Sequence, residues 1–484
     1  MVVDTYKSIL SYLNDITNGT EFDGKVYAVG GAVRDFIMHR EIKDVDLVVE
    51  LPNGGIEFAK WMETNGYTCG SVVTYPTYGT AMFRISEYPD EEIECVQTRK
   101  EQYKDKNSRN PETEYGTIEE DALRRDFTVN ALYQRLDGAV IDPTGNGFTD
   151  IKEHLIRTTS SPDIVFNDDA LRILRGIRFF SKFHAESKYW MIDDCTFKGM
   201  VRNIDRLSII SKERIADELN KMLLSNDPVS AIDMLVSTGA ITYVIPEIKE
   251  SIGIEQNKYH IGDVFSHSIC VLSNVVSKPF YENIFNEQQK LALRMSALLH
   301  DIGKIKTRTV DDKGNVHFYF HDLASVELCD TILRRLKYSN DFIGLVRFLV
   351  GNHMRTKNWL NDCSHMKDKS IRKLQYDCKE ETRYKLLISL IDADNKSHAE
   401  CFCLPNQCFI IDKRTSEMIS DGTSMFDYRL PIDGNDVMAI KKLKPGKEVK
   451  ECMDYALKIV FNEPNINREK LLKYIKNYKL KTNK

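Results

Sequence analysis

The sequence predicts an α+β protein in which an N-terminal α/β head with a mixed sheet is followed by an all-helical body. Residues 26–31, VYAVGG, form an apolar run that ends in two glycines, and residues 32–40 then follow a helical pattern. A second run, DVDLVV at 44–49, alternates acid and apolar residues as a strand does. From about residue 160 onward, apolar residues recur at the spacing of one helix face, so helices should dominate the chain.

Chain length indicates several domains. With 484 residues the chain is too long for one hydrophobic core. We expect a head at 1–150, a helical neck and body at 151–250, a second helical domain at 251–410 and a helical tail at 411–484.

Composition indicates a cytoplasmic protein with no membrane partner. No apolar stretch is long enough to span a bilayer, and the N-terminus lacks the pattern of a secretory signal. The 11 cysteines are odd in number and follow no repeating spacing, which favours reduced thiols. The sequence does not indicate an oligomeric state.

The charge is unevenly distributed. A net charge of −5 would by itself argue against a nucleic-acid ligand. The tail from Arg468 to Lys484, however, holds seven basic residues and one acidic residue. Solvated helix surface and contact with RNA both explain this run, and the sequence leaves the two open.

The first glycine pair predicts a phosphate site. Gly30 and Gly31 allow the backbone to approach a ligand, and free N–H groups at the start of the following helix favour a triphosphate. Arg34 lies in the first turn of that helix and can add a charge-assisted contact to the same phosphates.

Two aspartates predict a magnesium site. Asp44 and Asp46 are at i and i+2, so in a strand they share one face. Paired carboxylates of this kind hold Mg²⁺ for in-line phosphoryl transfer. Such alternation alone is more often a solvated strand face.

The ordered set of motifs is more specific than any one of them. The string GGAVRDFIMHREIKDVDLVV resembles the nucleotidyltransferase superfamily, and within it the class II tRNA nucleotidyltransferase and bacterial poly(A) polymerase branch. The resemblance implies that Glu94 supplies a third catalytic carboxylate beside Asp44 and Asp46. It also implies that the basic loop 98–111 helps the final A addition.

The resemblance continues through RRDFTVNA at 124–131. It implies that Arg125 and Asp126 contact nucleotide phosphate and ribose, and that Asn130 helps to hold the site. Taken alone, the RRD triplet could equally be a cluster of surface ion pairs. The glycine-interrupted connector 141–157 is similar to the family's hinge motif.

A templating helix is predicted at NDDALRILRGIRFFSKF. Asp168, Asp169 and Arg172 can converge on one base edge, because carboxylates accept and guanidinium donates hydrogen bonds. The family has Glu where this chain has Asp168, one methylene shorter. The resemblance implies that Arg175 and Arg178, which continue along the helix, face RNA or the acids of the core. A helix with i,i+3 ion pairs is the structural alternative.

Downstream, Glu213, Arg214 and Glu218 are expected to be structural supports.

A second metal site is predicted in residues 255–400. The order of its histidines and aspartates reproduces the ligand order of HD-domain phosphohydrolases, with His267, His300, Asp301 and Asp392 as the central set and His321 and His353 where binuclear members carry extra ligands. The resemblance implies a divalent metal of unidentified type. It also implies hydrolysis of 2′,3′-cyclic phosphates, 2′-nucleotides or other phosphate esters.

These motifs predict template-independent addition of CCA to a tRNA 3′ end from CTP and ATP. A bacterial poly(A) polymerase or an A-adding enzyme is the first alternative, since that branch shares most of the motifs. The basic 98–111 loop favours CCA addition. A protein uridylyltransferase would share the HD domain but not RRDFTVNA, and a catalytically dead RNA-binding protein would not be expected to keep both carboxylates.

Overall fold

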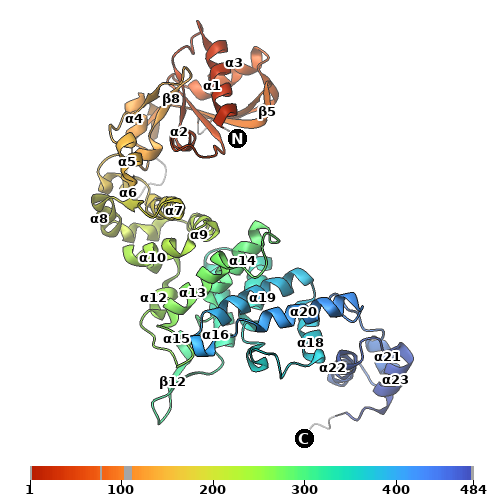
Figure 1. Ribbon diagram of the computed structural model, residues 1–484. Helices are drawn as coiled ribbons and strands as arrows, with labels where there is room; N and C mark the ends of the chain where they lie inside the picture. The colour runs from red at the N-terminus through yellow and green to blue at the C-terminus, as the bar shows by residue number, and fades with distance from the viewer. Residues whose placement is uncertain (1–2, 77–78, 103–111, 481–484) are drawn as a thin grey trace. The chain divides into compact units, whose positions relative to one another are not determined.

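The computed structural model describes residues 3–76, 79–102 and 112–480 and divides the chain into two compact units (Figure 1). The first unit is Met1–Val244 and the second is Ile245–Lys484. Residues 103–111 of the predicted basic loop lie outside the described residues.

The first unit contains a mixed seven-stranded sheet with the strand order β3-β4-β5-β2-β1-β8-β9. Strands β2 and β5 are parallel, and the other neighbours are antiparallel. This mixed sheet and the helices that follow it confirm the predicted α+β class. The sheet strands are β1 (Val26–Val29), β2 (Val45–Val49), β3 (Thr68–Tyr75), β4 (Thr80–Ile85), β5 (Tyr88–Gln97), β8 (Tyr133–Arg135) and β9 (Val140–Ile141).

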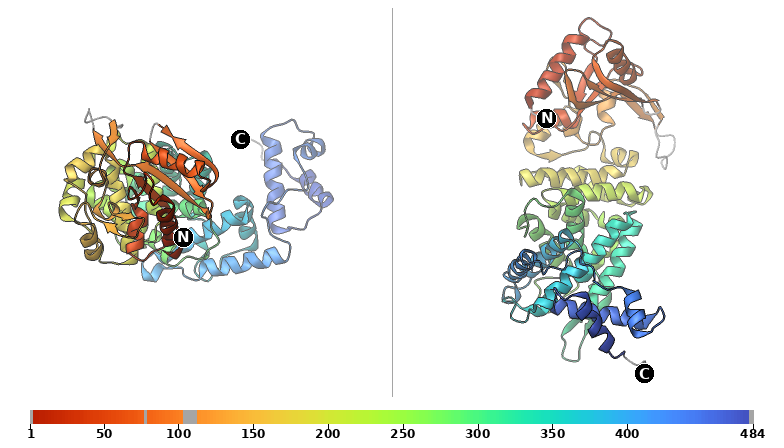
Figure 2. Two further views of the ribbon diagram at one scale, coloured as in Figure 1. Left: turned by 90° about the horizontal axis from the view of Figure 1, so that it is seen from above. Right: turned by 90° about the vertical axis from the view of Figure 1, so that its right-hand side faces the viewer.

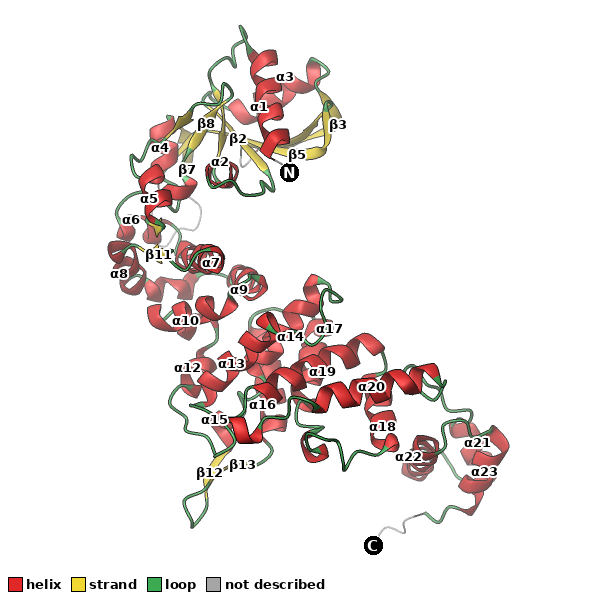
Figure 3. Cartoon of the chain, viewed as in Figure 1, coloured by secondary structure: helices red, strands yellow, loops and turns green. Residues whose placement is uncertain are grey.

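Helices cover both faces of the sheet (Figure 3). Helices α1 (Val3–Thr17) and α3 (Gly54–Thr64) pack on one face with Val45, Leu47 and Val49 of β2. Helix α4 (Ile118–Leu123) packs on the other face with Val48. Because side chains alternate along a strand, Asp46 lies on the α4 side.

The rest of the first unit is mainly helical. Helix α2 (Gly31–Ile37) follows β1 directly, and two short ribbons are formed by β6 (Arg99–Gln102) with β7 (Glu112–Tyr115) and by β10 (Leu155–Ile156) with β11 (Met191–Ile192). On α7, residues Leu171, Ile173, Leu174 and Ile177 are buried at helical spacing, which leaves the arginines between them on the opposite face. The remaining helices are α5 (Gly147–Glu153), α6 (Pro162–Asp168), α7 (Leu171–Glu186), α8 (Asp194–Arg202), α9 (Lys212–Leu224), α10 (Pro228–Thr238) and α11 (Ile241–Val244).

Within residues 245–480, the elements of the second unit are helices apart from one hairpin, β12 (Arg308–Val310) with β13 (Val316–Phe318). Its last three long helices gather around a core of their own, shown in dark blue in Figure 2. No helix in the described part of the chain is long and apolar enough to cross a membrane. The helices are α12 (Pro246–Ser251), α13 (Val264–Ser277), α14 (Glu287–Leu299), α15 (Lys304–Thr307), α16 (His321–Arg335), α17 (Asn340–Asn352), α18 (Asp368–Cys378), α19 (Glu381–Lys396), α20 (Gln407–Ser420), α21 (Gly434–Lys441), α22 (Lys447–Asn462) and α23 (Arg468–Asn477).

Candidate functional sites

A pocket of 480 Å³ in the first unit gathers most of the predicted nucleotide-binding residues. The turn after β1, the start of β2, the segment after α4, helix α7 and helix α9 all contribute to its lining. Nine of the lining side chains are basic and five are acidic, so the pocket favours an anionic ligand. The predicted residues in its lining are Gly30, Gly31, Arg34, Asp44, Asp46, Arg125, Asp126, Asn130, Asp169, Arg172, Arg175 and Arg178.

Gly30 brings the backbone close to the acidic and basic groups of this pocket. Its φ of +73° lies in the left-handed region that glycine adopts without strain. A Cβ at this position would lie 3.5 Å from Arg125 Nη1 and 3.9 Å from Asp46 Oδ2. The diglycine turn is therefore adjacent to both the candidate metal ligand and the candidate phosphate ligand.

The predicted catalytic carboxylates lie at the start of β2 and on β5. Asp44 directly precedes β2 and is exposed, whereas Asp46 is the second residue of the strand. Glu94 is the Cα partner of Asp46 on the parallel strand β5, so the two share one face of the sheet, although Glu94 does not line the pocket. Burial, followed by the charge of Glu94, raises the pKa of Asp46 to about 6. A divalent cation would relieve this crowding of negative charge, so these residues fit Mg²⁺.

A chain of hydrogen bonds links α2 to α7. Arg34 Nη1 donates to Asn130 Oδ1 (2.5 Å), and Asn130 Nδ2 donates to Asp126 Oδ1 (3.1 Å). The other oxygen of Asp126 accepts from Arg175 Nε at 2.8 Å. Burial alone would raise the pKa of Asp126, but the Arg175 guanidinium holds it at about 2. Arg34 and Asp126, two of the predicted nucleotide ligands, are thus held in position by hydrogen bonds to Asn130 and Arg175.

Asp121 is a site residue that sequence reasoning missed. Its side chain is fully buried and accepts hydrogen bonds from Arg124 (2.7 Å), Arg125 (3.0 Å) and the Tyr133 hydroxyl (2.5 Å). It also accepts from the backbone N–H of Arg99, at the start of β6. Asp121 therefore fixes the two pocket arginines of the RRD motif. The capping box of α4, formed by Thr117 and Glu120, is the only nearby signal, and it does not indicate this role.

Acid should weaken the first unit through Asp121 and Asp126. Burial opposes ionisation of Asp121, but Arg125, Arg124 and Tyr133 hold its pKa at about 2. A depressed carboxyl pKa contributes stability above the unfolded value of 3.8 and loses it as the pH falls toward 2. Over that window, protonation of each carboxylate should therefore lower the free energy of unfolding by about 2 kcal/mol.

Urea unfolding at steps from pH 5 to pH 2 measures this loss. In a Trp359→Phe background, Trp61 and Trp190 report the first unit alone. The stability gap between this protein and its Asp121→Asn variant should shrink as the pH falls. A gap that stays constant would contradict the assignment of Asp121 as an ionised partner.

The predicted templating residues contact protein groups in this structure. Asp169 Oδ2 accepts from Arg214 Nη2 at 2.7 Å, and Arg172 donates to the backbone carbonyls of Arg124 (2.6 Å) and Val165 (3.2 Å). Asp168 Oδ2 lies 4.0 Å from Arg172 Nη1 and does not line the pocket. Asp169 and Arg172 thus take part in contacts with α9 and with the segment after α4 in this structure.

Arg178 makes an internal ion pair with the predicted support Glu218. Arg178 Nε donates to Glu218 Oε2 at 2.7 Å, and Glu218 is buried. The guanidinium also lies 4.4 Å from the Phe179 ring centroid. The ion pair between Arg178 and Glu218 thus links α7 to α9.

Histidines and aspartates gather in the second unit. His267 Nε2 lies 3.1 Å from Asp394 Oδ1 and 3.3 Å from His300 Nε2. Asp301 lies 3.3 Å from His300 Nε2 and 3.3 Å from His321 Nε2. His353 Nε2 is 3.6 Å from the same carboxylate. The structure therefore brings together five of the six predicted ligands of the HD site.

Asp394 replaces Asp392 in this cluster, which corrects the prediction. Both aspartates lie on α19, but residues two apart point to different sides of a helix. Asp392 Oδ2 instead pairs with Lys396 at 2.6 Å. Asp394 faces the histidines and belongs to the candidate metal groups of the described residues, whereas Asp392 does not.

The tautomers of three histidines fit a metal. His300, His321 and His353 each place Nδ1 within 2.9 Å of a backbone carbonyl three residues earlier. A carbonyl only accepts hydrogen bonds, so Nδ1 carries a proton, and Nε2 is the ring atom that faces the cluster and can bind a metal. His353 Nε2 is buried without a hydrogen-bond partner. Such a group would be satisfied by a divalent ion.

Two lysines, Lys304 and Lys357, also contact the aspartates of the HD site. Lys304 Nζ lies 2.6 Å from Asp301 Oδ2, and Lys357 Nζ lies 2.9 Å from Asp394 Oδ2. Burial alone would raise the pKa of each carboxyl, but the two ammonium groups and the neighbouring histidines hold both pKa values well below the usual range. The motif HDIGK contains Lys304, whereas no local pattern marks Lys357.

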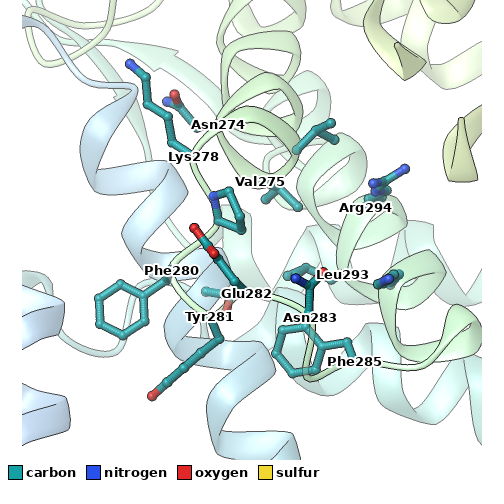
Figure 4. A pocket seen from close by; sticks show the side chains of 14 residues that line it. Asn274, Val275, Lys278, Phe280, Tyr281, Glu282, Asn283, Phe285, Leu293 and Arg294 are labelled. Carbon is teal, nitrogen blue, oxygen red and sulfur yellow. The ribbon is translucent and has the colours of Figure 1, made fainter. Parts of the chain in front are cut away.

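A separate pocket of 260 Å³ lies beside α13 and α14 (Figure 4). Phe280, Tyr281 and Phe285 line it together with Glu282 and Arg294. None of the predicted site residues and none of the candidate metal groups lines this pocket.

Comparison with protein families gives three consecutive matches. Residues 26–157 match the poly A polymerase head domain. Residues 191–252 match the "probable RNA and SrmB-binding site of polymerase A", and residues 264–395 match the HD domain.

Individual relatives match parts of the chain. The CCA-adding enzyme of Limosilactobacillus reuteri is 36% identical over 224 residues, 45% of this chain and 50% of the relative, so the chain spans about half the length of that enzyme. The multifunctional CCA protein of Pseudomonas aeruginosa (strain LESB58) is 28% identical over 68% of this chain and 74% of its own length. The A-adding tRNA nucleotidyltransferase of Deinococcus radiodurans is 32% identical over 49% of this chain and 52% of its own length.

A solved structure shares the fold. The CCA-adding enzyme of Bacillus stearothermophilus in complex with CTP superposes with a TM-score of 0.62 at 18% identity. The superposition covers 96% of this chain and 95% of that one.

The fold and the family matches define a nucleotidyltransferase head followed by an RNA-binding region and an HD domain. Over these residues the chain is similar to the class II tRNA nucleotidyltransferase and bacterial poly(A) polymerase family.

Proposed function

We propose that the chain adds CCA to the 3′ end of tRNA, using CTP and ATP as donors. The observation that carries this proposal is the position of Asp44 and Asp46 beside the diglycine turn, in one pocket rich in arginine. The relatives named for CCA addition and the CTP complex of a structure with the same fold support it.

The carboxylates would hold Mg²⁺ in this pocket, with Glu94 on the neighbouring strand. When bound, Mg²⁺ lowers the pKa of the attacking 3′-hydroxyl and offsets the charge that develops on the phosphate. The backbone of Gly30 and Gly31 approaches the triphosphate, and Arg34 and Arg125 bind its oxygens.

Selection between C and A would rest on α7. Asp169 accepts and Arg172 donates hydrogen bonds, which matches the mixed edge of either base. A base with the wrong pattern would leave buried polar groups unpaired and would be rejected. Asp168 lies outside the pocket lining, with Oδ2 4.0 Å from Arg172 Nη1, and would act through Arg172.

Incorporation assays on a tRNA that lacks its CCA end test the proposal. With CTP alone the product should stop after two C residues, and with both nucleotides it should end in CCA. Long tails made from ATP alone would instead identify a poly(A) polymerase. Addition of a single A only to a tRNA that already ends in CC would identify an A-adding enzyme, the activity named for the Deinococcus radiodurans relative.

We also propose that the HD site hydrolyses phosphate esters. His267, His300, Asp301, His321, His353 and Asp394 would hold a divalent metal of unidentified type. When bound, such a metal activates water and polarises the phosphate. The convergence of histidine Nε2 atoms and two carboxylates supports this proposal.

Three further expectations stay predictions. They are the four-part division at residues 150, 250 and 410, the contact of the basic tail with tRNA, and the cytoplasmic location. The tail helices pack around a core that includes Leu471 and Ile475, which leaves their basic side chains facing outward.

A further inference from the structure

One aromatic ring lies against three arginines of the nucleotide pocket. Phe179 is buried on α7 and lines that pocket. The guanidinium carbon lies 4.4 Å from the ring centroid in Arg178, 5.5 Å in Arg34 and 5.7 Å in Arg175. Cations within about 6 Å of an aromatic ring are attracted to its electron-rich face. We call Arg34, Arg175 and Arg178 the arginine cluster.

Each member of the arginine cluster also pairs with a carboxylate of its own. The pairs, at 2.7 to 2.9 Å, are Arg34 with Asp35, Arg175 with Asp126 and Arg178 with Glu218. These carboxylates come from α2, from the segment after α4 and from α9. The ring of Phe179 is therefore the group that the three arginines share.

The arginine cluster keeps N–H groups for a ligand. A guanidinium has five N–H groups. On described residues Arg34 uses three of them, two on Asp35 and one on Asn130. A Cβ on Gly31 would lie 3.6 Å from Arg34 Nη2, so this end of the guanidinium lies beside the diglycine turn. Its remaining donors are in place for a phosphate at that turn.

Two further rings fix the position of Phe179. Phe183 stacks on it, with 5.8 Å between the ring centroids, and Phe127 meets it edge-on at 6.0 Å. Phe127 comes this close to α7 because Gly176 has no side chain: a Cβ there would lie 2.8 Å from Phe127 Cζ. The ring that the arginines share is thus held in place by packing.

Three like charges around one ring repel one another. The negative face of the ring offsets part of that repulsion, so the arginine cluster stays together before an anion arrives. A ligand that meets groups already in place loses less free energy in ordering them. The electron density of the Phe179 ring should therefore contribute to the affinity for a polyanion.

We propose that Phe179 is a positioning residue for nucleotide addition, and that its ring holds the arginine cluster together for the triphosphate. This inference rests on the proposed function, in which the pocket binds the triphosphate of CTP or ATP. Because Phe179 acts through arginines that bind phosphate, its effect should not depend on the base. Loss of the attraction between ring and cations should weaken triphosphate binding by about tenfold.

The experiment replaces Phe179 of the full-length protein with monofluoro- and trifluorophenylalanine. Fluorine withdraws electrons from the ring face while the ring keeps its shape and stays apolar. Calorimetry with Mg²⁺ present and tRNA absent gives the affinities for CTP, ATP and inorganic tripolyphosphate, which has no base. The matched control carries the same replacements at Phe180, the next residue of α7, which stacks on His184 and does not line the pocket.

The affinity for all three ligands should fall stepwise with fluorination at Phe179, by about tenfold for the trifluoro ring, while Tm stays the same. Phe179→Leu should show a similar loss of affinity, and Phe179→Tyr, which keeps an electron-rich ring, should retain most of it. The Phe180 replacements should leave every affinity unchanged.

An unchanged affinity in the trifluoro protein would overturn the inference. A loss for CTP and ATP but not for tripolyphosphate would also overturn it, because Phe179 would then act on the base. If the wild type binds tripolyphosphate but neither CTP nor ATP, the proposed function fails, while the tripolyphosphate titration still decides the role of Phe179. A wild type that does not bind tripolyphosphate would contradict the inference itself.

Discussion

Asp46→Asn should lower the rate of nucleotide addition by at least about a thousandfold, because it removes several kcal/mol of transition-state stabilisation by the bound metal. Asn keeps the shape of Asp but carries no charge and is a poor ligand for Mg²⁺. Asp44→Ala should have the same effect. The measurement is incorporation of labelled CTP into a tRNA that lacks CCA.

The same Asp46→Asn substitution should not lower the thermal stability of the protein. Burial and the charge of Glu94 raise the pKa of Asp46 to about 6, so the ionised carboxylate destabilises the folded state at neutral pH. Asp46→Asn removes that charge and should leave Tm unchanged or higher. Asp90→Asn, an exposed acid on the same strand as Glu94, is the control and should alter neither activity nor Tm. An inactive Asp46→Asn protein with a strongly lowered Tm would show that Asp46 is structural.

His300→Ala should abolish phosphate-ester hydrolysis and leave nucleotide addition intact. The His300 ring is fully buried, and its Nε2 lies 3.3 Å from both His267 and Asp301. Its removal takes one ligand from the candidate metal site that includes Asp301 and His267, so bound metal should fall sharply. Elemental analysis gives the metal content, and assays of both reactions on one preparation give the activities.

The control for this variant is the exposed His365→Ala, which should keep both activities. The reciprocal result is expected for Asp46→Asn, which should still hydrolyse phosphate esters. Loss of both reactions in either His300→Ala or Asp46→Asn would contradict the assignment of two independent sites.

Local patterns predicted the parts of the site that are close in sequence. The diglycine turn and the two aspartates lie within a strand, a turn and a helix, and the alternation of a strand decides which side chains share a face. The order of histidines along the second unit likewise predicted five of the residues that gather there.

Contacts between distant segments could not be predicted in this way. Asp121 lies twelve residues from Tyr133, and the chain has to fold before their contact exists. Asp169 meets Arg214 across 45 residues, which explains why a helix pattern alone did not show that this carboxylate is already paired. The choice of Asp392 over Asp394 failed for a simpler reason: both residues suit the HD motif by type, and only the orientation of α19 separates them.

A crystal structure of the full chain with CTP and Mn²⁺, with anomalous data collected at the manganese edge, tests the central claim most directly. The account predicts manganese bound by the carboxylates of Asp44 and Asp46, with the triphosphate against Gly30 and Gly31. Triphosphate bound elsewhere in the chain, or manganese absent from these two carboxylates while CTP is bound, would contradict it.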